Sequence, residues 1–119
     1  MFDQFFQIQG SFKEINIRDV CNKVRDHGIN VISNYIMGFP DDNQNTMQQT
    51  LDLALELNTE MANIYPCQAL PGSPMYHKAL KNGWELPDNY EGYAFLSYES
   101  LPLRTKYCSS AEILNFRDR

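Results

Sequence analysis

The fold is decided by the stretch Asn34-Tyr35-Ile36-Met37-Gly38-Phe39-Pro40-Asp41-Asp42. It closes an apolar run over residues 29–37 that is rich in β-branched and aromatic residues, which predicts a buried strand. Gly38 and Pro40 do not continue a strand ladder, so a loop must begin there. Asn45 as N-cap, with Gln48 as its capping-box partner, predicts a helix over about 45–58. Because α/β proteins bind ligands at the carboxyl ends of parallel strands, the sequence predicts a site at this loop.

Caps, stops and hydrophobic periods predict the elements on either side of this stretch. They are helices over about 17–27, over about 74–82 and from about Ser110 onward, and a second strand over about 61–67. The N-caps of the three helices are predicted at Asn16, Ser73 and Ser109. Residues 1–15 have no firm period and are expected to be a poorly defined N-terminal segment before one unit, residues 16–119.

The order strand, helix, strand predicts two parallel strands joined by a right-handed helical crossover. Parallel strands need cover on both faces, and two of them with a few helices make a poor closed domain. We therefore expect an α/β fragment whose sheet needs strands that this chain lacks. The side chains of Val31, Ile32 and Ile64 are expected to be uncovered in it.

Composition narrows the class of protein. The net charge is −5 and the ten Lys and Arg residues are scattered, so no nucleic-acid partner is predicted. No segment has the length of a membrane span, and we expect a cytoplasmic protein without a membrane partner. The three widely spaced cysteines fit reduced thiols, with Cys21 and Cys67 buried and Cys108 exposed.

The ordered set of motifs resembles the C-terminal half of the core domain of the radical S-adenosylmethionine (radical SAM) superfamily. Within it, the chain is most similar to iron–sulfur oxidoreductases of the cobalamin-binding type. The resemblance covers about Gly10 to Arg119. It is carried by Gly28-Ile29-Asn30-Val31-Ile32, Asn34 to Asp42, Thr46-Met47, Thr50-Leu51-Asp52-Leu53-Ala54, Leu70-Pro71-Gly72-Ser73-Pro74, Ser97-Tyr98-Glu99 and Ala111 to Asp118.

The resemblance implies a fragment of a partial TIM-type (β/α) barrel with two parallel strands and flanking helices. It also implies part of a pocket for the adenine of S-adenosylmethionine. The family motif G-x-I-x-G-x-x-E falls on Asn34, Ile36, Gly38 and Asp41, and two of these four residues differ from it. In this reading Ile36 offers an apolar surface to the ring and Gly38 lets the backbone approach the cofactor. The end of the next strand, Cys67-Gln68-Ala69-Leu70, is expected to supply backbone polar groups near the adenine edge.

The family's cluster loop, C-x-x-x-C-x-x-C, does not occur in this sequence. In the family that loop holds a [4Fe-4S] cluster that chelates S-adenosylmethionine, and cobalamin is a possible further cofactor. The resemblance therefore implies no catalytic or metal-binding residue in this chain, no tightly bound cofactor and no activity on its own. The expected partner is the missing N-terminal half of the domain or another polypeptide. The alternative is a non-catalytic remnant or interaction module that pairs with another chain.

Several residues have a plainer interpretation. Asp41 and Asp42 precede a helix, where the helix dipole stabilises carboxylates without any further role. His27 and His77 lack metal-ligand spacing and are expected at the surface or in caps. The tyrosines between residues 84 and 107 are expected to form aromatic packing at the open end of the barrel.

Overall fold

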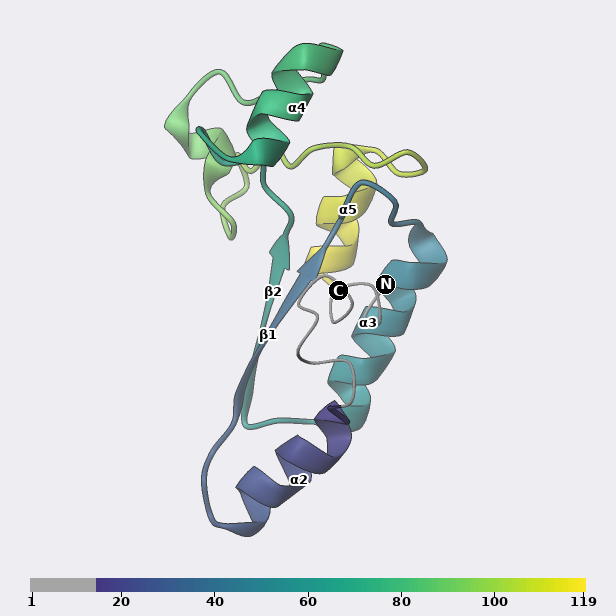
Figure 1. Cartoon of the computed structure of the whole chain (residues 1–119), viewed down its shortest axis with the longest axis vertical. Coiled ribbons are helices and arrows are strands. Elements are labelled where there is room, and N and C mark those ends of the chain that lie inside the picture. The colour runs from purple at the N-terminus through teal and green to yellow at the C-terminus, as the bar shows by residue number, and fades with distance from the viewer. Residues whose placement is uncertain (1–14) are drawn as a thin grey trace.

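The computed structural model describes residues 15–119, which form an α/β arrangement around a two-stranded parallel sheet (Figure 1). The elements are α2 (Ile17–Asp26), β1 (Ile32–Met37), α3 (Gln44–Leu57), β2 (Met61–Pro66), α4 (Pro74–Asn82), the 3-10 helix η1 (Tyr90–Tyr93) and α5 (Ser110–Arg117). The strands pair in parallel, from Ile32 opposite Met61 to Met37 opposite Pro66, which confirms the predicted pairing. Within the described residues the sheet has these two strands and is not closed into a barrel. The predicted N-terminal segment, apart from Ile15, lies outside the described residues.

Three of the predicted helix starts are confirmed. The side chain of Asn16 accepts from the backbone of α2, and that of Ser73 accepts from Tyr76 N in α4. Ser109 and Glu112 form a reciprocal capping box at α5. The longest helix of the described residues is α3, which has 14 residues. None of the helices in the described part of the chain is long and apolar enough to cross a membrane.

The predicted start of α3 is wrong by two residues. Asn43, not Asn45, is the N-cap, with extended backbone angles and a side chain that accepts from Thr46 N. Thr46 Oγ1 in turn accepts from Asn43 N at 3.0 Å, which completes the capping box. Gln48 donates instead to Asp52 Oδ1 at 2.9 Å, one turn further along. Asn43 and Asn45 are both suitable N-caps, and the hydrogen bond to the Thr46 hydroxyl favours Asn43.

The first strand begins three residues later than predicted, at Ile32. Gly28 has φ +75°, and Ile29 N still bonds back to Val24 O of α2, so the chain is leaving the helix here. β2 begins only at Met61, opposite Ile32, so residues 29–31 have no ladder partner within the described residues. β1 therefore begins where β2 first pairs with it, and the apolar pattern does not set its start.

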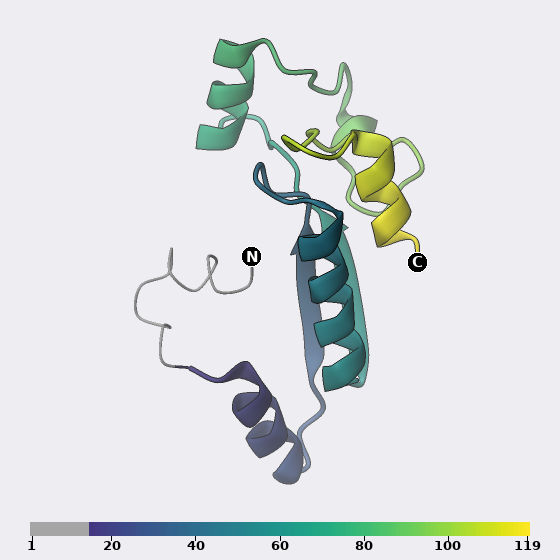
Figure 2. The same ribbon diagram turned by 90° about the vertical axis from the view of Figure 1, so that its right-hand side faces the viewer.

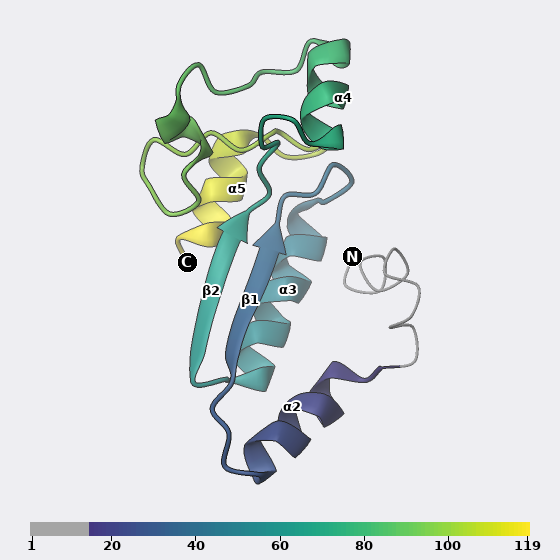
Figure 3. The same cartoon turned by 60° about the vertical axis from the view of Figure 1, so that its left-hand side comes forward.

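The helices α3 and α5 cover one face of the sheet. Met37 and Ile64 of this face pack against Met47 of α3 and Ile113 and Phe116 of α5. Figure 3 shows α3 behind and beside β1, and Figures 1 and 2 show α2 beyond the amino ends of the strands and α4 beyond their carboxyl ends. The expectation of three uncovered apolar side chains is therefore right for Ile32, which is 60% exposed, but wrong for Val31 and Ile64, which are partly buried.

Cys108 was predicted to be exposed, and this is wrong. Its side chain is buried in the cluster with Met37 and Ile113. The cause is a tight turn before α5, in which Thr105 Oγ1 accepts from Cys108 N at 2.8 Å and Thr105 N donates to Cys108 O at 2.9 Å. Cys21 and Cys67 are buried as predicted.

Candidate functional site at the carboxyl ends of the strands

The loop after β1 is held by the carboxylate of Asp42, which is 2% exposed. Its Oδ2 accepts from the backbone N–H groups of Gly38 and Phe39, each at 3.0 Å. Its Oδ1 accepts from Thr46 Oγ1 of α3 at 2.8 Å. Asp42 therefore connects the end of β1 to the start of α3, a role beyond the interaction with the helix dipole that was expected of it. Asp41 is exposed.

Gly38 lies at the end of β1 with φ +86°, a conformation that favours glycine. A Cβ built at this position would lie 2.9 Å from Ile113 Cγ2. The backbone of Gly38 therefore approaches α5, on the covered side of the sheet. This contact is a structural reason for glycine, and the approach of a cofactor to Gly38 stays a prediction.

The sheet has a second face, opposite α3 and α5, which we call the uncovered face. It consists of Ile32, Asn34, Ile36, Met61, Asn63 and Tyr65, which share one side in the parallel register. Asn63 Nδ2 donates to Asn34 Oδ1 at 3.0 Å across the two strands. Nearer the carboxyl ends Ile36 is 42% exposed, and Tyr65 meets Phe95 edge-on with ring centroids 5.5 Å apart. Two predicted pocket residues, Asn34 and Ile36, are thus brought together here.

The other predicted pocket residues lie elsewhere. Ala69 is buried with Ala79 and Leu103 in a cluster under α4, and Leu70 is exposed. Gln68 belongs to the strand end whose backbone was expected near the adenine, but no role of its side chain was predicted. It is buried, and its Nε2 donates to Ser100 Oγ at 2.9 Å and to Gly92 O at 3.3 Å. Gln68 therefore fastens the irregular segment around η1 to the strand end.

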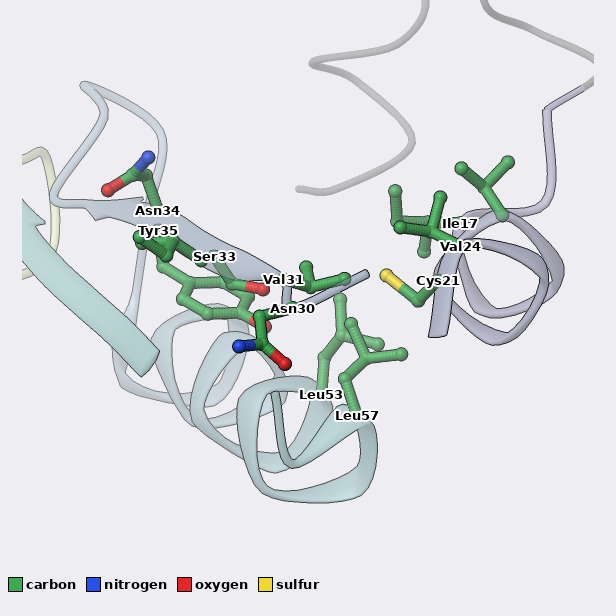
Figure 4. A pocket seen from close by; sticks show the side chains of 12 residues that line it. Ile17, Cys21, Val24, Asn30, Val31, Ser33, Asn34, Tyr35, Leu53 and Leu57 are labelled. Carbon is green, nitrogen blue, oxygen red and sulfur yellow. The ribbon is translucent and has the colours of Figure 1, made fainter. Parts of the chain in front are cut away.

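A pocket of about 510 Å³ opens between α2, β1 and α3 at the amino end of the sheet (Figure 4). Its walls are mainly apolar, and Figure 4 shows Cys21 of α2 pointing toward Val31 and Leu57. The hydroxyl of Tyr35, which also lines it, is buried without a hydrogen-bond partner within the described residues. Asn34 reaches the edge of this pocket, so it borders both the pocket and the uncovered face.

The three thiols lie apart, in α2, after β2 and before α5. Burial, with a smaller contribution from the Asp42 carboxylate, raises the pKa of the Cys67 thiol to about 11. Burial also raises the pKa of Cys108. Because the thiolate is the form that attacks electrophiles, the protonated Cys67 thiol is a poor nucleophile at neutral pH.

The raised pKa of Cys67 predicts a loss of stability at high pH. An unfolded thiol has a pKa near 9.0, so both states are protonated below that value and the contribution is fully present. Between pH 9 and 11 the unfolded thiol ionises first, which favours unfolding. We expect the native chain to lose of the order of 2 kcal/mol more than Cys67→Ala across this range. Urea unfolding of both proteins at several pH values measures the difference, and parallel stability curves would contradict it.

The two histidines lie at different helices. His27 is exposed and caps α2, with Nδ1 2.6 Å from Lys23 O, and His77 is exposed on α4. Among residues 15–119 there is no group of three or more His, Cys, Asp or Glu side chains that could hold a metal ion.

Comparison of the sequence with protein-family models and with curated proteins finds no match.

Proposed function

We propose that this chain is the C-terminal portion of a radical SAM domain, where it contributes barrel wall and part of the adenine pocket of S-adenosylmethionine. The observation that supports this most is the placement of Asn34 and Ile36 side by side on the uncovered face of a parallel β1–α3–β2 unit. In a barrel whose helices lie outside, the face opposite α3 is the inner face. The motif residues that resemble the family's pocket would then face the interior.

The chemistry of the uncovered face suits a nucleoside. Ile36 offers exposed apolar surface next to the Tyr65–Phe95 pair, which an adenine ring can contact. Asn34 Oδ1 already accepts a hydrogen bond from Asn63 Nδ2. The side-chain NH2 group of Asn34 is a donor, so it suits a ligand atom that accepts a hydrogen bond. An adenine nitrogen or a ribose oxygen is such an acceptor.

The cysteines of this chain do not fit an iron–sulfur cluster. They are buried in three separate places, in α2, after β2 and before α5. In this proposal the cluster, and cobalamin if it is used, would be held by residues of the missing N-terminal half, and the chain alone would be inactive. The partner in the protein is that half, whether it belongs to the same polypeptide or to another.

The second candidate function is a non-catalytic interaction module. It is favoured by the apolar surface at the amino end of the sheet, where Ile29, Ile32 and Val20 are 57%, 60% and 41% exposed. Within the described residues each strand has one unpaired edge, which can accept a strand from another chain. An interaction module would bind a partner chain and would have no affinity for a nucleoside. A titration with a nucleoside therefore distinguishes the interaction module from the adenine pocket.

Nuclear magnetic resonance titration of the chain with S-adenosylmethionine tests the proposal. We expect shifts of the Asn34 and Asn63 side-chain amide signals, with a dissociation constant of about 1 mM because most of the pocket is absent. Ile36→Glu should abolish the shifts, since it places a charge where the ring would lie. Leu55→Glu, a matched change at a 77% exposed leucine on α3, should leave them unchanged. Absence of saturable shifts, or equal shifts in the two variants, would refute the pocket.

A further inference from the structure

A second pocket lies at the carboxyl ends of the strands, and its lining is charged where that of the first pocket is mainly apolar. It measures about 460 Å³, within the range of small-molecule sites, and lies between the loop after β1, α4 and the segment before α5. The residues that line it include three cationic residues, one acidic residue and Trp84. The cations are Lys78, Arg104 and Lys106, and the carboxylate is Asp41.

Within the described part of the chain, no carboxylate forms an ion pair with the cations of this pocket. Within residues 15–119 the ion pairs closer than 4.0 Å are Arg18–Glu56, Arg25–Glu60 and Arg117–Asp118. Lys78 and Lys106 instead lie over the rings of Trp84 and Tyr107, 5.8 and 5.3 Å from the centroids. In a chain with a net charge of −5, three such cations around one hollow form a local excess of positive charge.

The walls of the pocket are fixed by hydrogen bonds. Lys106 N donates to Pro40 O at 3.0 Å, which joins the segment before α5 to the loop after β1. Thr105 is buried and its Oγ1 accepts from Tyr107 N at 3.0 Å as well as from Cys108 N. On the opposite wall Trp84 N donates to Ala79 O at 2.9 Å, at the end of α4. The backbone that carries the charges is therefore ordered before any ligand arrives, which favours binding.

We propose that this pocket binds an organic phosphate monoester that carries a flat apolar group. Three positive charges against one negative leave an excess of two, which matches the charge of a phosphate monoester at neutral pH. The Arg104 guanidinium supplies the paired donors that suit a phosphate, and Trp84 supplies a surface for the apolar group. The pocket and its ligand are independent of the uncovered face, although Asp41 belongs to the pocket residues predicted from the sequence.

The chain contains its own probe, because Trp84 is its single tryptophan. Titration of the whole chain with phenyl phosphate at constant ionic strength should change the fluorescence of Trp84 in a saturable way. Inorganic phosphate, which lacks the ring, and benzoate, which has one negative charge, should each bind about tenfold more weakly or worse. Arg104→Gln should weaken phenyl phosphate by about tenfold.

The matched control is Lys81→Gln, which removes the same charge from an exposed position on α4 that does not line the pocket. It should bind phenyl phosphate as the unaltered chain does. Circular dichroism checks that both variants fold, which is expected because Arg104 and Lys81 are exposed. A linear, non-saturable response, equal affinity of the two variants, or benzoate binding as tightly as phenyl phosphate would overturn the proposal.

Discussion

Replacing Gly38 by valine is expected to lower the free energy of unfolding by about 3 kcal/mol. Two effects add at this position. Its φ of +86° is unfavourable for a branched side chain, which costs about 1–2 kcal/mol. The new Cβ would also lie 2.9 Å from Ile113 Cγ2, in a cluster where Ile113 is fully buried, and overpacking of this kind costs about 1–3 kcal/mol.

Gly72 offers a control for the backbone effect alone. It has the same φ of +86°, but a Cβ built there would meet no atom within 4 Å. Urea unfolding of Gly72→Val should therefore show only the backbone cost, and the additional loss in Gly38→Val measures the contact with α5. Equal losses in the two variants would show that α5 does not press on the strand end.

This result bears on how the proposed adenine pocket can be tested. The family resemblance implied that Gly38 lets a cofactor approach the backbone, which would make it a natural position to change. In the structure a side chain at Gly38 would first displace Ile113, so lost binding in such a variant would have a structural cause. Ile36, which is 42% exposed on the uncovered face, is the better position because its replacement does not disturb a buried cluster.

Local signals in the sequence predicted most of the elements. Side chains that cap their own helix, such as Asn16 and Ser73, act over two or three residues, so a linear pattern contains all the information needed. The parallel pairing followed from the helical crossover between the strands. The start of α3 was missed for a local reason, because Thr46 completes a capping box with Asn43. The start of β1 was missed because a contact distant in sequence decides it, since Met61 begins the pairing opposite Ile32.

The candidate site was harder to predict for the same reason. Asn34 and Ile36 lie two residues apart in one strand, and such residues share a face of the sheet. The surroundings of Ala69 and Gly38 have no such local rule, because α4 and α5 pack against them from later in the chain. The pocket with Lys78 and Arg104 joins segments on either side of η1, and no local spacing indicates it.

Asp42→Ala is expected to destabilise the chain by about 3 kcal/mol. The carboxylate is buried and accepts three hydrogen bonds, two of them from backbone N–H groups at the end of β1. Removing it leaves the Gly38 and Phe39 donors without this acceptor, and an unsatisfied buried donor costs about 1–3 kcal/mol. Thermal or urea unfolding measures the loss.

The neighbouring residue provides the control, because Asp41→Ala removes the same charge one position earlier from an exposed side chain. Its effect should stay within about 0.5 kcal/mol. Asp42→Asn keeps an oxygen that can accept from the strand end, so it should lose only the charge-assisted part of the bonds, about 1 kcal/mol. A loss of under about 1 kcal/mol for Asp42→Ala would contradict the prediction. The strand end would then be held by Ile113 and the rest of its buried cluster, without a contribution from the carboxylate.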